Sequence, residues 1–242
     1  MAIGVPYEDI DISGTVGNAG AVSVIYGSYG GFSVPHGGLR ATVPLGGIGR
    51  DDQLWTQDSP DIDDYAELSD SFGLKLATGD FNKDGYSDLV TRVGFEKVGT
   101  AWDAGAVNVI YGSQEGLKAT ASTVGNIITG RTDQFWTQDS PDIEEQAEPA
   151  DFFGESLATG DFNKDGISDL AIGVMEENIG TVEGAGAVSV IYGSIGIFIN
   201  SGGLSPTVPL GGSGRADQIW TQNSTDIEDE VEAGDFFGGS VA

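Results

Sequence analysis

Two short loops carry the residues whose types and spacing could do chemistry in this chain. Residues 159–170 have the sequence Thr-Gly-Asp-Phe-Asn-Lys-Asp-Gly-Ile-Ser-Asp-Leu, and residues 78–89 repeat it with Tyr86 in place of Ile167. Asp and Asn alternate with other residues, so three oxygen-bearing side chains can converge on one point before a glycine permits a sharp turn. Oxygen donors at positions 1, 3 and 5, a glycine at position 6 and a backbone carbonyl near position 7 are what a calcium ion requires.

These loops differ from an EF-hand, whose twelfth position carries a bidentate Glu. That position is Thr91 in one copy and Ile172 in the other, and the carboxylate stands at position nine, as Asp88 and Asp169. The short apolar run that follows is typical of a strand and not of an exiting helix. An ordinary turn uses the same residue types. Because both copies keep all four acceptor positions, the sequence favours calcium.

The composition argues against several classes of partner. The chain of 242 residues has 38 acidic and 10 basic residues and a formal net charge of −28. Nucleic acids and anionic membrane surfaces need the opposite charge. No apolar run approaches the roughly 18 residues of a transmembrane helix, no signal peptide is visible, and cysteine is absent, which excludes disulfides. The charge suits a divalent cation or a basic partner.

Internal repeats organise the chain. Three motifs recur: Gly-Ala-Val-(Ser/Asn)-Val-Ile-Tyr-Gly-Ser at 20–28, 105–113 and 186–194; Trp-Thr-Gln-(Asp/Asn)-Ser at 55–59, 136–140 and 220–224; and Phe-Gly at 72–73, 153–154 and 237–238. The copies lie about 80 to 85 residues apart, which indicates three units, approximately 1–89, 90–170 and 171–242. The last unit ends before its calcium loop.

Each unit contains four candidate strands. In the third copy they are residues 155–160, 170–174 and 187–192 and a segment around Trp220. Continuous apolar character predicts that the first two are buried on both faces, whereas the fourth alternates like an edge strand. Helical periodicity is absent. The predicted fold class is therefore all-β, a β-propeller with three four-stranded antiparallel blades per chain.

The residues resemble a known family at this point. Phe153-Gly154, the loop at residues 161–169 and the strand that follows resemble the FG-GAP repeat of integrin α-chain propellers, and the Trp-Thr-Gln-Asp-Ser-Pro element resembles bacterial FG-GAP proteins. The resemblance implies a calcium-stabilised, non-catalytic propeller, extracellular or at the cell surface, used in cell adhesion or recognition. It implies two Ca²⁺ ions per chain, held by Asp80, Asn82, Asp84, Asp88 and the carbonyl of Tyr86, and by Asp161, Asn163, Asp165, Asp169 and the carbonyl of Ile167.

The chain departs from the family pattern in three ways. Thr91-Arg92-Val93 puts a charge where a small residue is expected. The family's propellers have more than the three blades for which this chain has material. A third calcium loop is missing, because Val241-Ala242 stands where it would begin.

The ends of the chain suggest how a ring could close. The first strand candidate, Ala2–Val5, corresponds to a second strand of the repeat, and residues 237–242 correspond to a first strand. Propellers have about four to eight blades. If the C-terminal strand of one chain completes the N-terminal blade of another, two chains make a closed six-bladed ring. We therefore expect a homodimer by blade sharing.

The blade topology sorts the loops onto two faces. The calcium loops share one face, and the other collects the acidic stretches 7–11, 58–70, 139–151 and 226–235. These stretches predict a recognition surface for a basic or cation-bridged partner, protein or glycan, or solvated loops that maintain solubility.

Candidate catalytic residues are sparse. His36 is the only histidine and has no nucleophile elbow nearby, and zinc would need Cys or a second His. Trp55, Trp136 and Trp220 repeat with the units and are expected to pack, whereas Trp102 does not repeat and could contact a ligand. We expect a non-catalytic, calcium-binding recognition scaffold. The alternatives are a lectin-like propeller and, further away, a polysaccharide hydrolase or lyase with paired carboxylates.

Overall fold

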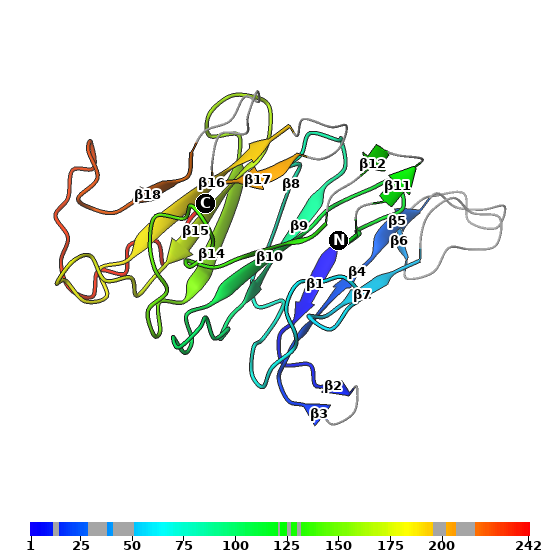
Figure 1. The fold of residues 1–242 in the computed structure, drawn as a ribbon, viewed down its shortest axis with the longest axis horizontal. Coiled ribbons are helices and arrows are strands. Elements are labelled where there is room, and N and C mark those ends of the chain that lie inside the picture. Colours follow the sequence, from blue (N-terminus) through cyan, green and yellow to red (C-terminus); the bar gives the residue numbers. More distant parts are fainter. Residues whose placement is uncertain are drawn as a thin grey trace.

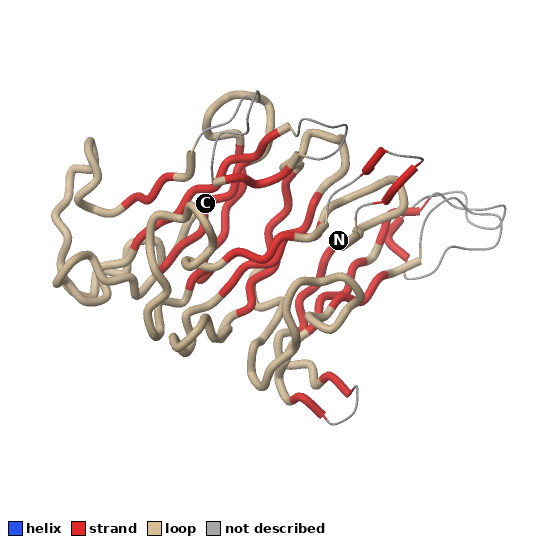
Figure 2. Tube along the Cα trace, in the orientation of Figure 1, coloured by secondary structure: helices blue, strands red, loops and turns tan. Residues whose placement is uncertain are grey.

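The computed structural model describes residues 1–11, 15–28, 38–40, 51–120, 122–124, 127–129, 132–195, 202–206 and 216–242. His36 lies outside these residues. Every regular element within them is a β-strand, as Figure 2 shows. No helix in this part of the chain is long and apolar enough to cross a membrane.

Three antiparallel sheets lie side by side in chain order (Figure 1). The first has the order β1 (Ala2–Val5), β4 (Ala21–Val24), β7 (Gln53–Trp55). The second has the order β8 (Leu76–Gly79), β9 (Asp88–Val93), β10 (Ala106–Ile110), β13 (Gln134–Trp136). The third consists of β14 (Phe153–Gly160), β15 (Asp169–Val174), β16 (Ala187–Ser194), β17 (Gly203–Ser205) and β18 (Gln218–Trp220), the last two both pairing with β16.

Three small ribbons complete the described strands. They are β2 (Ile10–Asp11) with β3 (Thr15–Val16), β5 (Tyr26–Ser28) with β6 (Gly38–Arg40), and β11 (Ser122–Val124) with β12 (Ile127–Thr129). The all-β, antiparallel expectation is confirmed. Four strands per sheet describe the second sheet as it stands, while the first has three described strands and the third has five.

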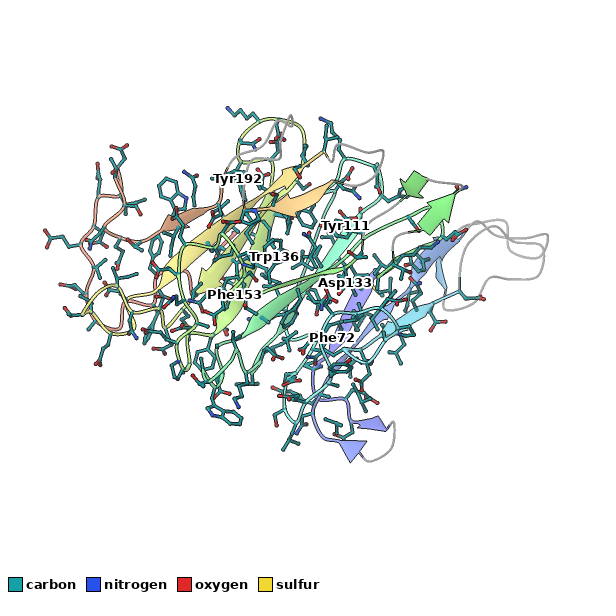
Figure 3. The ribbon with its side chains drawn as sticks, viewed as in Figure 1. Phe72, Tyr111, Asp133, Trp136, Phe153 and Tyr192 are labelled. Atoms are coloured by element: carbon teal, nitrogen blue, oxygen red, sulfur yellow. The ribbon has the colours of Figure 1, made fainter. Side chains whose placement is uncertain are left out.

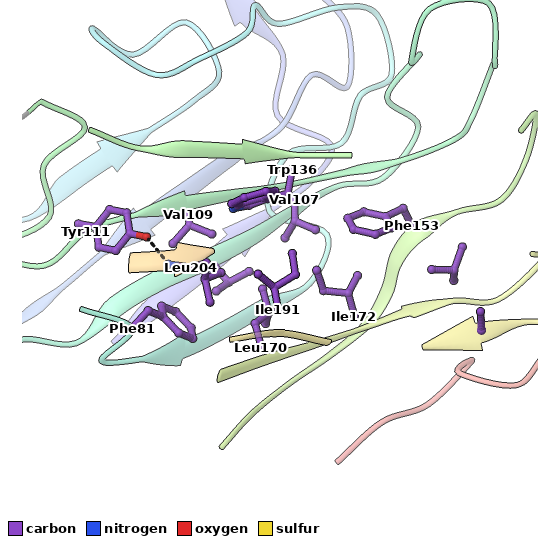
Figure 4. Packing of buried hydrophobic residues seen from close by; sticks show 13 residues of the cluster. Phe81, Val107, Val109, Tyr111, Trp136, Phe153, Leu170, Ile172, Ile191 and Leu204 are labelled. Atoms are coloured by element: carbon purple, nitrogen blue, oxygen red, sulfur yellow. Dashed lines mark hydrogen bonds between the residues drawn. The ribbon is translucent and has the colours of Figure 1, made fainter. Parts of the chain in front are cut away.

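The sheets pack face to face through apolar side chains that repeat from one sheet to the next. Both β9 and β15 are buried at all six positions, so the expected burial on two faces is confirmed for the second strand of each unit. It is wrong for the first strands, because β8 and β14 are only partly buried. Between the second and third sheets, Trp136 (Figure 3) packs with Val109, Ile172 and their neighbours in one cluster (Figure 4). A matching cluster between the first and second sheets contains Val24, Trp55 and Leu89, among others.

The repeated Phe-Gly and Gly-Ala motifs meet at each sheet junction. Phe153 is fully buried, and its N–H donates to the carbonyl of Ala104 at 2.7 Å. Gly105 follows with φ +81°, and a Cβ there would lie 2.5 Å from the Phe153 carbonyl oxygen. Only glycine permits both this backbone conformation and this approach. The Phe-Gly and Gly-Ala motifs therefore recur together because they contact each other at each junction.

A polar link, which the sequence analysis missed, also joins neighbouring sheets. The side-chain amide of Gln53 donates to the carbonyl of Leu117 at 3.0 Å and accepts from the Leu117 N–H at 3.1 Å. One sheet further on, the amide of Gln134 donates to the carbonyl of Leu204 at 3.0 Å, and the Leu204 N–H donates to the Tyr111 hydroxyl at 3.2 Å. The glutamine two residues before the repeated tryptophan thus binds the main chain of the next sheet at both junctions.

Arg92 is a buried charge at a position that carries glycine in the other two sheets, Gly4 and Gly173. Its guanidinium pairs with the carboxylate of Glu155 in the next sheet. Gly154 makes room, since a Cβ there would lie 3.1 Å from the Arg92 Cγ. The charge is therefore compensated across the sheet junction.

Candidate calcium loops

The two predicted calcium loops lie at the same edge of neighbouring sheets. Residues 80–88 connect β8 to β9, and residues 161–169 connect β14 to β15, so both loops join strands as expected. The loops touch: Asp80 N donates to Ser168 Oγ at 3.0 Å, and Ser168 N donates to the Asp80 carbonyl at 3.0 Å. Lys83 Nζ donates to the carbonyl of Asp165 at 3.0 Å. A structural change in one loop can therefore alter the position of the other loop.

In the first loop the oxygens at positions 1, 3 and 5 turn toward the loop's own main chain. Asp84 N donates to Asp80 Oδ1 at 3.1 Å and to Asn82 Oδ1 at 3.0 Å. Gly85 N donates to Asp80 Oδ2 at 3.0 Å, and Tyr86 N donates to Asp84 Oδ1 at 2.9 Å. Two oxygens from different side chains thus meet at a single N–H, which places them on the inner side of the turn.

The second loop repeats this arrangement. Asp165 N donates to Asp161 Oδ1 at 3.0 Å and to Asn163 Oδ1 at 2.9 Å. Gly166 N donates to Asp161 Oδ2, and Ile167 N donates to Asp165 Oδ1, both at 2.9 Å. The same oxygen-lined turn therefore forms twice.

The carboxylates at position nine hold the loops to the sheets. Asp88 is fully buried and accepts from Phe81 N at 2.9 Å and from Gly112 N at 2.8 Å. Asp169 accepts in the same way from Phe162 N at 2.8 Å and from Gly193 N at 3.0 Å. Burial raises the pKa of Asp88 to about 7 and raises that of Asp169. Through these hydrogen bonds, each side chain connects the start of its loop to a glycine near the end of β10 or β16.

The donor set fits a hard cation such as calcium, because the loop side chains that turn inward offer carboxylate and amide oxygens and no nitrogen or sulfur ligand. Within the described residues, no three acidic, histidine or cysteine side chains gather around one point. A complete coordination shell would thus draw on Asn82 or Asn163 and on main-chain carbonyls besides the aspartates.

The acidic stretches on the opposite face are not uniformly solvated. Two groups of polar side chains lie there, and we call them the first cage (Gln57, Asp64, Asp70 and Glu96) and the second cage (Gln138, Glu145, Asp151 and Glu177). Asp64 and Glu145 are half-buried, and the other six residues are buried. Burial, reinforced by neighbouring carboxylates, raises the pKa values of Glu96 and Glu177 far above their usual range. Burial also raises the pKa values of Asp70 and Asp151 to about 6. The repeated glutamine and glutamate were the sequence signal that could have found these groups.

Trp102, the tryptophan that does not repeat, is 64% exposed, whereas Trp55 and Trp136 are buried. The Nζ of Lys97 lies 4.2 Å from the centre of the Trp102 ring. These two residues line a cleft of about 430 Å³ together with Tyr7 and Phe95. The expected division between packing tryptophans and one available aromatic side chain agrees with these exposures.

Sheets joined by Phe-Gly junctions, with an oxygen-lined loop in the second and in the third sheet, define a class of all-β repeat proteins. The FG-GAP repeat family model matches residues 72–109 and 153–191, which span β8 to β10 and β14 to β16. The chain therefore carries two FG-GAP repeats, in its second and third sheets.

Similar proteins carry the same repeats within longer chains. The chain is 34% identical over 131 residues to phosphatidylinositol-glycan-specific phospholipase D of Rattus norvegicus, covering 54% of this chain and 14% of that protein. It is 30% identical over 162 residues to the Bos taurus protein of the same name, covering 66% and 17%. It is 32% identical over 142 residues to the Homo sapiens protein, covering 58% and 14%. The chain thus spans about a sixth of these relatives or less.

Proposed function

We propose that this chain is a calcium-binding β-propeller scaffold that serves as a non-catalytic recognition module. The observation that carries the proposal is the pair of oxygen-lined loops within the FG-GAP repeats. FG-GAP repeats are typically non-catalytic modules. The relatives are named as phospholipases, but the match covers only a small part of their length, so their activity is not part of the proposal. We propose an extracellular or cell-surface location as well, because FG-GAP repeats occur in extracellular and secreted proteins.

The proposed ligands are those of each loop. Asp80, Asn82, Asp84 and Asp88 with the Tyr86 carbonyl would hold one Ca²⁺, and Asp161, Asn163, Asp165 and Asp169 with the Ile167 carbonyl would hold the other. Bound calcium supplies positive charge against the loop carboxylates. The chain's own residues contribute the turn geometry and, through the Ser168–Asp80 contact, the connection between the two sites.

Calcium titration of loop variants tests this function. Asp161→Ala should remove one ion and leave the Asp80 loop able to bind, and Asp80→Ala should do the reverse. At calcium a hundredfold above its Kd, each site adds about 2.7 kcal/mol to the free energy of unfolding, so chelation should lower Tm. Glu183→Ala, at an exposed position outside both loops, is the control. An unchanged Tm in chelator and in millimolar calcium would contradict the proposal.

A carbohydrate-binding function is the second candidate, and the cleft beside Trp102 favours it. Aromatic side chains, Tyr7, Phe95 and Trp102, line it together with Glu67 and Asp103, and a largely apolar cleft with a few polar groups is typical of ligand sites. Quenching of tryptophan fluorescence by a panel of oligosaccharides, lost in Trp102→Ala, would support it. Identical affinity in that variant would count against it.

The proposed assembly is a homodimer by blade sharing, closing as a six-bladed ring. Ile3 and Val5 are 41% and 38% exposed on the outer face of the first sheet. The matching positions of the third sheet, Ile172 and Val174, are buried against a neighbouring sheet. A second copy of the third sheet would cover the exposed face in the same way.

A further inference from the structure

The first cage encloses carboxylates that no described side chain neutralises. Gln57 is 1% exposed and follows β7, and Glu96 is 6% exposed in the connection from β9 to β10. Gln57 Nε2 lies 3.2 Å from Asp64 Oδ2, 3.5 Å from Glu96 Oε2 and 3.5 Å from the Tyr65 carbonyl. The other amide atom, Gln57 Oε1, is buried without a hydrogen-bond partner. The side-chain amide of Gln57 thus contacts the cage through its nitrogen, while its oxygen has no hydrogen-bond partner.

The second cage repeats the arrangement one sheet further on. Gln138 and Glu177 are both 2% exposed, and Gln138 Nε2 donates to Glu177 Oε2 at 2.5 Å. Gln138 Oε1 and Asp151 Oδ1 are buried without a hydrogen-bond partner. Asp151 is 1% exposed, so a nearly inaccessible carboxylate keeps one oxygen unsatisfied.

Buried carboxylates need a compensating charge or a proton. The ion pairs of the described chain are Lys75 and Arg92 with Glu155, and Lys118 with Glu115. None of them involves a cage residue. The compensation is therefore either a proton on a cage carboxylate or a positive charge that the described side chains do not supply.

The cages form only where two sheets meet, because each draws on the connection between sheets and on a loop of the later sheet. Glu8 occupies in the first sheet the position of Glu96 and Glu177, since all three carbonyls accept from the glycine that precedes the third strand, at 2.9 to 3.1 Å. Glu8 has no glutamine before it and is exposed. Gln222 occupies the glutamine position after β18, and its Nε2 donates to Asp229 Oδ2 at 3.3 Å. The described residues therefore form two cages, one around Gln57 and one around Gln138.

We propose that each complete cage binds one divalent cation of the calcium class, in addition to the ions of the loops. The first cage would use the carboxylates of Glu96 and Asp64, the Gln57 Oε1 after a half-turn of its amide, and the Tyr65 carbonyl. The second would use the carboxylates of Glu177 and Asp151 and the side-chain oxygen of Gln138. All of these donors are oxygens, which suits calcium and not zinc.

A cation in a cage would clamp the connection between two sheets onto the later sheet. Gln57 and Asp64 belong to the segment between β7 and β8, whereas Glu96 belongs to the loop between β9 and β10. These segments are held together at the edge opposite the calcium loops. The proposal is independent of the loop sites, because the two sets of ligands share no residue.

Calcium stoichiometry of the full 242-residue chain tests the inference. Equilibrium dialysis at saturating calcium should give four ions per chain, two from the loops and two from the cages. Glu96→Gln and Glu177→Gln should each remove one ion, and the double variant should retain the two loop ions. Glu8→Gln, the same change at the exposed equivalent position, should leave the number unchanged.

The possible results separate the cages from the loops. Two ions in the unaltered chain, both lost with Asp80→Ala and Asp161→Ala, would overturn the cage sites and leave the loops intact. Folded Glu96→Gln and Glu177→Gln variants with unchanged stoichiometry would show that the cages hold protons instead. Four ions that fall by one with each cage variant but not with the loop variants would support the cages and contradict the loops.

Discussion

Arg92 stands where the first and third sheets carry glycine, and its side chain is 2% exposed. Its partner Glu155 comes from the next sheet and is 25% exposed at the side chain. Burial lowers the pKa of Arg92, and the Glu155 charge opposes that shift. At the scale of single residues, the structure thus keeps a buried cation only where a carboxylate meets it.

Removal of Glu155 should therefore destabilise the protein. Glu155→Ala leaves a buried guanidinium without its partner, and we expect a loss of about 2 kcal/mol in the free energy of unfolding, reduced from a fully buried pair because Glu155 is partly exposed. Denaturant unfolding measures it. Glu115→Ala removes the partner of Lys118 in a pair whose Glu side chain is 73% exposed, and should change stability far less. Equal effects of the two variants would contradict this prediction.

Asp133 should make stability depend on pH. Its Oδ2 accepts from Asp63 N at 2.7 Å, and burial raises its pKa from 3.8 to about 6. Because the folded value is the higher one, the stabilising contribution of the proton is present below about pH 4 and is lost as pH rises through 6. Asp133→Asn cannot lose a proton, so from pH 4 to 7.5 the original protein should lose on the order of 2 kcal/mol relative to it.

The matched control for this pH series is Asp52→Asn. Asp52 precedes Gln53 as Asp133 precedes Gln134, but Asp52 is exposed. Thermal unfolding across the pH range should show a much smaller change between the original protein and this variant. A pH-independent difference between the original protein and Asp133→Asn would refute the assignment.

At the scale of elements, neighbouring sheets are joined by the same contacts at each junction. Apolar clusters fill the two junctions, and the glutamine of the fourth strand binds the main chain beyond it. Sheet-to-sheet packing, and not loop contacts alone, therefore sets how one repeat sits on the next.

Gln134→Ala should cost more stability than Gln218→Ala. The first change leaves the Leu204 carbonyl without its 3.0 Å hydrogen bond, for which we expect a loss of about 1 to 2 kcal/mol. Gln218 occupies the equivalent position in the third sheet, but its described hydrogen bond is to Tyr192 in the same sheet. Chemical denaturation of both variants measures the difference. A larger loss for Gln218→Ala would show that the contact to the next sheet does not matter.

At the scale of the whole molecule, the stack of three sheets has two unlike outer faces. The first sheet exposes Ile3, Val5 and Leu54. The far side of the third sheet carries Val190, Tyr192 and Trp220, which pack with Val241. The outer face of the first sheet corresponds to the face that the second and third sheets turn toward the preceding sheet. The outer face of the third sheet corresponds to the face that the first and second sheets turn toward the following sheet. The two outer faces are therefore of the kinds that pack against each other at the internal junctions.

Light scattering of the 242-residue chain should report a dimer at micromolar concentration. Leu54 is 66% exposed on β7, on the same face as Ile3, because both pair with Ser23. Leu54→Asp should therefore shift the mass to that of one 25.0 kDa chain. Leu68→Asp changes a residue of similar exposure, 74%, in the cleft beside Trp102, and should remain dimeric. A single-chain mass for the unaltered protein would contradict blade sharing.

The strands, the repeated units and the oxygen-lined loops could be predicted from the sequence because each depends on residues close together in the chain. Alternating apolar residues define a strand, and the spacing of Asp80, Asn82 and Asp84 alone turns the oxygens of Asp80 and Asn82 toward the Asp84 N–H. Tertiary structure decided the rest. Gln57 meets Glu96 across 39 positions, Gln134 meets Leu204 across 70, and Arg92 meets Glu155 across 63. Whether each of these polar residues is hydrogen-bonded or unsatisfied depends on the neighbouring sheet that buries it. No local pattern in the sequence predicts which sheet that will be.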